Sequence, residues 1–127
     1  MFDDAPVERE DPVDLDDEEG PVLVCRACGT RIARVAWIGS VDGGSPERVF
    51  FNPAGVMMQV VTLRHATNLR ETGPPTQEFS WFPGYAWRFA QCGGCGRQLG
   101  WRFLAVGGAQ PASFWGLLRT ELTEEEE

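Results

Sequence analysis

The chain has 127 residues, 43% of them hydrophobic, with five tryptophans, eight phenylalanines and a formal net charge of −8 at pH 7. This length is typical of a single domain. No run of 18 apolar residues is present, so no membrane span is predicted. Residues 1–24 lack a basic start followed by an apolar stretch, which excludes a secretory signal and favours a cytoplasmic location.

The negative charge is concentrated at the two ends of the chain. Residues 1–20 have a net charge of −9 and residues 121–127 of −5, whereas the part between them has a net charge of +6. Residues 1–20 contain too few apolar groups to offset the entropy of ordering, and we predict a disordered acidic tail there. Residues 21–123 are the expected folded domain, and 124–127 form a second acidic tail.

We interpret these acidic tails as segments that keep the protein soluble. The alternative is that they bind a partner. The same charges would repel phosphate, so no nucleic-acid partner is predicted.

After residue 21, short apolar runs alternate with glycine and proline, which predicts an all-β domain. The expected strands are 22–25, 31–38, 47–51, 56–64, 77–82, 85–91, 98–106 and 113–122. Turn chemistry is expected at 39–46, 72–75 and 107–111. The stretch 56–70 is the least decided, since its pattern also permits a helix.

The cysteines form two C-x2-C pairs, separated by 63 residues: Cys25 with Cys28, and Cys92 with Cys95. Two such pairs supply the four thiolates of a tetrahedral zinc ion, and the glycine after each pair permits the tight turn that this needs. The pattern predicts one structural Zn²⁺, with no open position for catalysis. Disulfides and a thioredoxin-type redox pair are less favoured, because a reducing compartment is expected and the pairs are matched.

The single histidine, His65, has no partners that would make a catalytic triad or a metal site, and we interpret it as an ordinary strand residue. Trp37 and Trp115 are expected in the core.

The densest signal is aromatic. Trp81 and Trp87 flank a Pro-Gly turn and can face each other, while Trp101 and Phe103 share one face of a strand. Gly100 would let another group approach closely. Three indoles and a phenyl ring can thus form one small pocket. Aromatic walls suit a cation or a neutral ring, and the absence of acids between 79 and 120 favours the neutral ring.

The run FSWFPGYAWRFAQCGGCGRQLGWRF, with VFFNPAG upstream and FWGLLRTEL downstream, closely resembles the CULT domain, the thalidomide-binding domain of the cereblon family. The resemblance covers about residues 22–122 and is strongest to single-domain bacterial members. It implies a β-tent fold, in which two antiparallel sheets are pinned by one structural zinc. The zinc ligands would be Cys25, Cys28, Cys92 and Cys95.

The resemblance also implies a binding site for a cyclic imide (glutarimides such as thalidomide, succinimides, hydantoins and C-terminal cyclic imides of proteins) or for a uracil-like ring. In it, the ring N–H donates to the backbone carbonyl of Phe79, a ring carbonyl accepts from the N–H of Trp81, and Trp87 can donate its indole N–H. Phe79, Ser80 and Trp81 would lie on a strand. The implied ligand-binding residues are Asn52, Pro53, Phe79, Ser80, Trp81, Trp87, Trp101 and Phe103.

These expectations describe a binding domain and not an enzyme. A methylammonium reader with the same aromatic cage is one alternative, weakened by the missing carboxylate. A methionine sulfoxide reductase-like tent protein is another, weakened because its chemistry needs a cysteine beyond the zinc ligands. No Lon-like domain or helical adaptor segment is present in this sequence, so no ubiquitin-ligase adaptor is expected to bind this chain alone. A monomer is expected.

Overall fold

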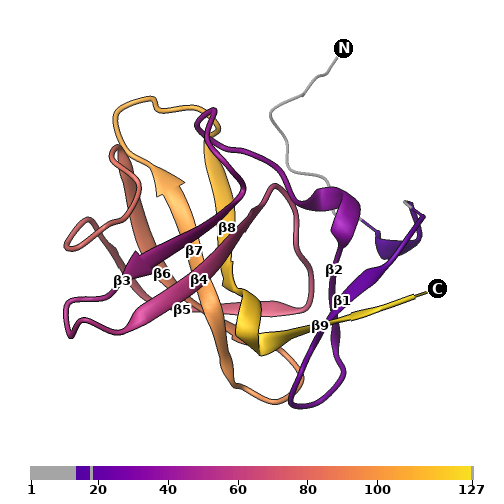
Figure 1. Cartoon of the computed structure of the whole chain (residues 1–127). Helices are drawn as coiled ribbons and strands as arrows, with labels where there is room; N and C mark the ends of the chain where they lie inside the picture. The colour runs from indigo at the N-terminus through magenta and orange to yellow at the C-terminus, as the bar shows by residue number, and fades with distance from the viewer. Residues whose placement is uncertain (1–13, 18, 127) are drawn as a thin grey trace, which may run out of the picture.

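The computed structural model describes residues 14–17 and 19–126, which fold into two antiparallel β-sheets (Figure 1). The three-stranded sheet has the order β2-β1-β9, and the six-stranded sheet the order β3-β4-β8-β7-β6-β5. The described helices are three short 3-10 turns. The elements are η1 (Leu15–Asp17), β1 (Val22–Cys25), β2 (Arg31–Arg34), η2 (Val35–Trp37), β3 (Glu47–Phe51), β4 (Met57–Leu63), β5 (Leu69–Thr76), β6 (Tyr85–Cys92), β7 (Gln98–Ala105), β8 (Ser113–Leu118), η3 (Arg119–Glu121) and β9 (Leu122–Glu125).

The predicted all-β class with two antiparallel sheets is confirmed. Five of the expected strands match β1, β3, β4, β6 and β7 in place, and 56–70 contains no described helix. Two expected strands are divided by short 3-10 turns: 31–38 ends in η2, and 113–122 becomes β8, η3 and β9. The second division matters for the fold, because it sends the chain from the six-stranded sheet back to the three-stranded one.

The prediction for residues 72–82 was wrong. A strand was expected at 77–82 after a turn at 72–75, but β5 spans Leu69–Thr76 and residues 77–84 form a loop. A strand with two prolines is possible here because β5 is the outer strand of its sheet, where a missing N–H breaks no ladder bond. The pairing with β6 shifts between Thr72 and Thr76, and Gly73 in that interval has φ +82°.

Two hydrophobic clusters stabilise this arrangement. The larger lies between the two sheets and includes Trp37 and Trp115, as expected. The smaller lies on the other face of the six-stranded sheet and contains five buried residues, namely Val41, Phe82, Tyr85, Phe103 and Phe114. Half-buried aromatic residues pack on this smaller cluster, which therefore supports whatever site they form.

The described residues at the two ends of the chain are partly folded, whereas the sequence predicted acidic tails there. Residues 1–13 and 18 of the predicted N-terminal tail lie outside the described residues, as does residue 127. Leu15, also placed in that tail, is buried, and the buried Arg34 donates hydrogen bonds to the carbonyls of Leu15 and Gly20. At the other end, Glu124 and Glu125 pair with β1 as part of β9.

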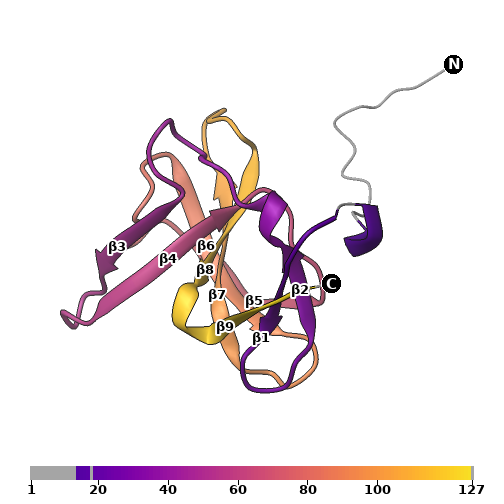
Figure 2. The same ribbon diagram turned by 45° about the vertical axis from the view of Figure 1, so that its right-hand side comes forward.

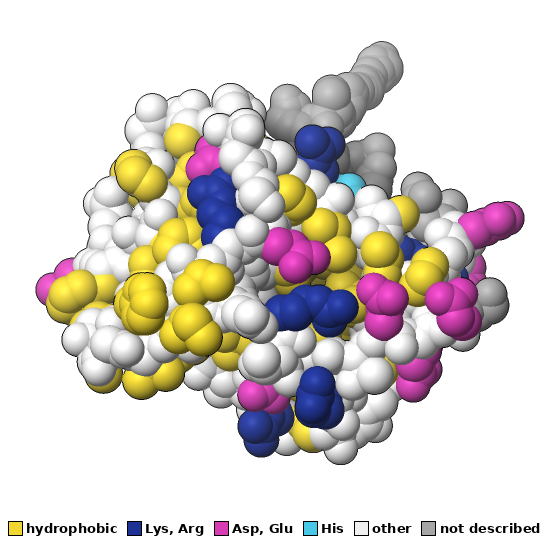
Figure 3. All heavy atoms as spheres, in the orientation of Figure 1, with side chains coloured by type: hydrophobic (Ala, Val, Ile, Leu, Met, Phe, Trp, Pro, Cys, Tyr) yellow, Lys and Arg dark blue, Asp and Glu magenta, His cyan; other side chains and the backbone are white. Residues whose placement is uncertain are grey.

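His65 lies just after β4, in an exposed position, with its ring edge-on to Trp37. Hydrophobic side chains gather on the surface near β3 and β4 (Figure 3). The large apolar residues of this region with exposed fractions of 49–62% are Val49, Phe51, Val56 and Met57. In the described part of the chain, no helix has the length and apolarity to cross a membrane.

Replacing Gly100 with alanine should strongly destabilise the domain. A Cβ at Gly100 of β7 would lie 2.2 Å from the carbonyl oxygen of Gly116 on β8, so the two strands would have to separate. We expect a loss of about 2–4 kcal/mol in the free energy of unfolding, measured by urea denaturation. Gly43→Ala is the matched control, because that glycine has φ +86° but open space around it, and it should cost only about 1 kcal/mol. Equal losses in the two variants would contradict the close approach of the strands.

Candidate ligand pocket and metal site

The four cysteines meet where the two sheets come together. Cys25 ends β1 of the three-stranded sheet and Cys92 ends β6 of the six-stranded sheet, while Cys28 and Cys95 lie in the turns that follow. All four Sγ atoms lie within 4.8 Å of one another. The cluster expected from the spacing is confirmed, and it joins the two sheets.

The two turns have the same backbone hydrogen bonds. The N–H of Gly29 donates to the carbonyl of Cys25 at 2.8 Å, and the N–H of Gly96 donates to the carbonyl of Cys92 at 2.8 Å. Both glycines have φ angles near +80°, a conformation that costs other residues energy. The glycine after each pair is thus required by the turn that presents the sulfurs.

The sulfur positions fit one tetrahedral metal ion. With a Zn–S distance of about 2.3 Å, neighbouring sulfurs of a tetrahedral site lie about 3.8 Å apart. The Sγ–Sγ distances are 3.8 Å for Cys25 and Cys95 and 3.6 Å for Cys28 and Cys92. A disulfide would need about 2.05 Å, so all four residues are free thiols able to act as ligands.

Local contacts set the ionisation of these thiols. Burial raises the pKa of the Cys25 thiol to about 12. The hydroxyl of Thr30 lies 3.0 Å from the Sγ of Cys28 and lowers the pKa of that exposed thiol to about 6. Beside the second turn, Arg97 pairs with the carboxylate of Glu121, and this contact lowers the pKa of Glu121. The ligand set therefore contains thiols of very different acidity.

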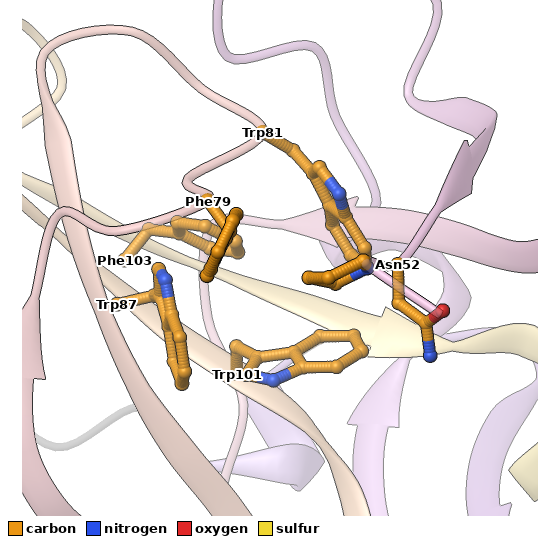
Figure 4. A pocket seen from close by; sticks show the side chains of 7 residues that line it. Asn52, Phe79, Trp81, Trp87, Trp101 and Phe103 are labelled. Atoms are coloured by element: carbon orange, nitrogen blue, oxygen red, sulfur yellow. The ribbon is translucent and has the colours of Figure 1, made fainter. Parts of the chain in front are cut away.

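A cavity of about 220 Å³ opens on the six-stranded sheet, over the smaller hydrophobic cluster. Figure 4 shows Trp81 and Trp87 on opposite sides of it, with Trp101 between them. Its lining contains seven of the eight residues implied by the resemblance and no charged side chain, namely Asn52, Pro53, Phe79, Trp81, Trp87, Trp101 and Phe103. The structure thus brings together residues from three separate parts of the chain.

Strand pairing in the six-stranded sheet fixes the positions of three lining residues, Trp87, Trp101 and Phe103. Trp87 on β6 lies directly opposite Phe103 on β7. Trp101 comes two residues before Phe103 on β7 and therefore lies on the same face of the sheet. Phe103 is 1% exposed and stacks on Phe114 of β8, with ring centroids 4.9 Å apart, so it forms a rigid floor. Trp81 meets Trp101 edge-on, with a centroid distance of 5.0 Å and an angle of 80°.

The loop 77–84 supplies the remaining wall and differs from the predicted strand. Phe79 has φ +59°, a strained conformation for a phenylalanine, and its side chain is 69% exposed at the pocket. Ser80 does not line the cavity, because its hydroxyl donates to the carbonyl of Phe82 at 3.1 Å. The expected strand position of Phe79, Ser80 and Trp81 is therefore corrected to a loop.

Two indole N–H groups are already used within the protein. Trp87 Nε1–H donates to the carbonyl of Glu78 at 2.7 Å, and Trp81 Nε1–H donates to the carbonyl of Phe51 at 3.3 Å. The expectation that Trp87 offers its indole N–H to a ligand is not met in this structure. By contrast, the backbone carbonyl of Phe79 and the backbone N–H of Trp81 have no hydrogen-bond partner within 14–17 and 19–126.

Two residues behind the pocket were not predicted from the sequence. Phe50 on β3 stacks on Trp81, and Gly116 on β8 leaves room for the Phe103 ring, since a Cβ there would lie 2.8 Å from Phe103 Cε2. Phe50 is the second residue of the quoted VFFNPAG run, but nothing in the sequence pairs it with Trp81. Gly116 could have been found only from the register that places it opposite Trp101.

The fold and the site together define a class: a four-cysteine, all-β domain whose sheet carries an aromatic-walled pocket. No family model matches the chain. Cereblon from Gallus gallus is 41% identical over 102 residues, which cover 79% of this chain and 23% of that protein. Cereblon from Xenopus tropicalis has the same identity and coverage, and cereblon from Drosophila willistoni is 34% identical over 101 residues.

The chain belongs to the cereblon-related CULT domain family. It spans about a quarter, or less, of the length of the curated relatives that it matches.

Proposed function

We propose that this chain is a non-catalytic domain that binds a small neutral ring in its three-tryptophan pocket. The ligands would be cyclic imides, including thalidomide-type glutarimides, succinimides, hydantoins and C-terminal cyclic imides of proteins, or uracil-like rings. The observation that carries the proposal is the pocket itself, which combines apolar aromatic walls with two backbone groups, the carbonyl of Phe79 and the N–H of Trp81, that have no partner among the described residues. Its volume of about 220 Å³ is below the range of drug-sized sites, which favours one ring over a large molecule.

Ring recognition would use the backbone of the loop. The carbonyl of Phe79 can accept a hydrogen bond, and the N–H of Trp81, two residues later, can donate one. A cyclic imide or uracil offers the complementary pair, an N–H next to a carbonyl. The methylene or carbon edge of the ring would then pack between the indoles. Burial of such a ring with two hydrogen bonds corresponds to a micromolar dissociation constant, or about −8 kcal/mol.

The lining residues also support binding without chemistry. They include no acid, no base and no thiol, and all four cysteines of the sequence lie in the metal cluster. A sulfoxide reductase would need a reactive cysteine at the pocket. A reader of methylammonium cations would gain from a carboxylate in the cage, and none lines this one. We also expect a monomer, without a nucleic-acid partner.

The metal in the cluster would be one Zn²⁺ with four cysteine ligands. Four thiolates in a tetrahedral arrangement are the ligand set that structural zinc prefers. With its four positions filled by protein, the ion would hold the two sheets together and would leave no place for a substrate.

A titration followed by tryptophan fluorescence tests the proposed function. Thalidomide, succinimide and uracil are added in separate experiments, with tetramethylammonium as the cationic comparison. We expect saturable quenching by at least one neutral ring at micromolar to submillimolar concentration, since three of the five indoles line the pocket. N-methylsuccinimide is the matched control ligand, because it lacks the N–H that would donate to Phe79. Quenching by the ammonium ion alone would refute the proposal in favour of a cation reader.

A further inference from the structure

The wall formed by Trp81 is not held by strand pairing. Trp81 lies in the loop 77–84, whereas Trp87 and Trp101 stand on paired strands of the sheet. Its position relative to Trp101 is nevertheless well defined, with an edge-on contact at 5.0 Å. Another part of the protein must therefore hold this indole in place.

Two consecutive residues at the end of β3 contact Trp81. The Phe50 ring is parallel to the indole, at an interplanar angle of 3° and a centroid distance of 4.7 Å. The carbonyl of Phe51 accepts the indole N–H at 3.3 Å. A hydrogen bond at one edge fixes a point of the ring but leaves its plane free to tilt, while a stacked ring fixes the plane.

Phe50 in turn is tied to the hydrophobic cluster under the pocket. Its ring lies edge-on to the buried Phe82, with centroids 5.4 Å apart, and Phe82 contacts the pocket floor Phe103 at 5.0 Å. Phe50 does not line the cavity. It connects the loop wall to the floor without touching the space that a ligand would fill.

We propose that Phe50 is a positioning residue that sets ligand affinity by holding the Trp81 wall parallel to its own ring. This inference rests on the proposed function, because the affinity in question is that for a neutral ring. Without the Phe50 ring, the indole would sample tilted orientations, and binding would have to restore the parallel one. The ordering of such a side chain would then weaken binding.

The test compares Phe50→Leu, which removes the stacked ring, with Phe50→Tyr, which keeps it. We expect Phe50→Leu to raise the dissociation constant for the best-binding ring by about three- to tenfold. Phe50→Tyr should stay within about twofold of the wild type. Val49→Ala is the control on the same strand, since alternate residues point to opposite faces and Val49 is exposed. Phe50→Met, of similar volume and without a ring, replaces the leucine variant if that variant fails to fold or loses its metal.

A second measurement does not depend on any ligand. Acrylamide quenching of the ligand-free protein, compared with the same measurement on Trp81→Phe, isolates the accessibility of Trp81. Accessibility should rise in Phe50→Leu and stay unchanged in Phe50→Tyr and Val49→Ala. Unchanged accessibility and affinity in Phe50→Leu, or equal losses in the leucine and tyrosine variants, would overturn the inference. If the wild type binds none of the rings, the proposed function fails, and the accessibility of Trp81 alone decides whether Phe50 positions it.

Discussion

Replacing Cys92 with serine should release the metal and remove most of the stability of the domain. Cys92 is fully buried at the end of β6, and its Sγ belongs to the cluster that joins this strand to β1 of the other sheet. A structural zinc site contributes about 10–16 kcal/mol of apparent binding free energy, which exceeds the stability of most small domains. The variant should therefore show loss of bound zinc by elemental analysis and no cooperative thermal transition.

The control for this substitution is Gln91→Ser, one residue earlier on the same strand and half-buried. It should keep one zinc per chain and a transition close to that of the wild type. Addition of a strong chelator to the wild-type protein should reproduce the behaviour of Cys92→Ser. A metal-free protein that melts as cooperatively as the wild type would show that the cluster is not a structural metal site.

Replacing Trp101 with alanine should abolish ring binding while leaving zinc content unchanged. Trp101 stands between the other two indoles (Figure 4), and its strand neighbour Gly116 offers no side chain that could take its place. Loss of one complete aromatic wall should cost about 3 kcal/mol or more of binding free energy, which is over a hundredfold in the dissociation constant. Calorimetric titration with the best-binding ring measures this directly.

Trp115→Phe is the matched control for Trp101→Ala. Trp115 is a buried core tryptophan of β8 that does not line the pocket. This variant should bind the ring as the wild type does. A Trp101→Ala protein that binds normally would show that the cavity is not the binding site, whereas equal loss in both variants would point to an effect on folding.

Local chemistry explains why much of the site was predictable from sequence. The C-x2-C spacing determines the geometry of each turn by itself, so the pairing of two such turns around one centre followed directly. Trp101 and Phe103 share a face because β7 alternates regularly, and this too follows from the sequence pattern. These predictions required no knowledge of contacts between distant segments.

The parts that were wrong or missed depend on such distant contacts. The prolines of β5 are compatible with a strand only because that strand lies at the edge of the sheet, which the sequence does not state. Because β5 ends at Thr76, Phe79 lies in the loop that follows this strand. Phe50 reaches Trp81 across 30 intervening residues, and only the folded arrangement reveals the stack.

The small sheet and the hairpin of β3 and β4 lie on opposite sides of the molecule (Figure 2), and β3 is left as an outer strand. The N–H of Asn52 donates to the carbonyl of Val56, and the N–H of Thr62 donates to the carbonyl of Pro46. In an antiparallel pair, bonded and non-bonded positions alternate. The residues of β3 whose backbone groups face outward are therefore Glu47, Val49 and Phe51.

An exposed strand flank of this kind is a template on which other chains can add and aggregate. Here both ends of the flank are already covered. The hydroxyl of Ser45 accepts a hydrogen bond from the N–H of Glu47 and donates one to the carbonyl of Glu47. The indole N–H of Trp81 donates a hydrogen bond to the carbonyl of Phe51. Among the described residues, the N–H and the carbonyl of Val49, in the middle of the strand, have no hydrogen-bond partner. The tryptophan that forms a wall of the pocket thus also removes one hydrogen-bond acceptor from this outer strand.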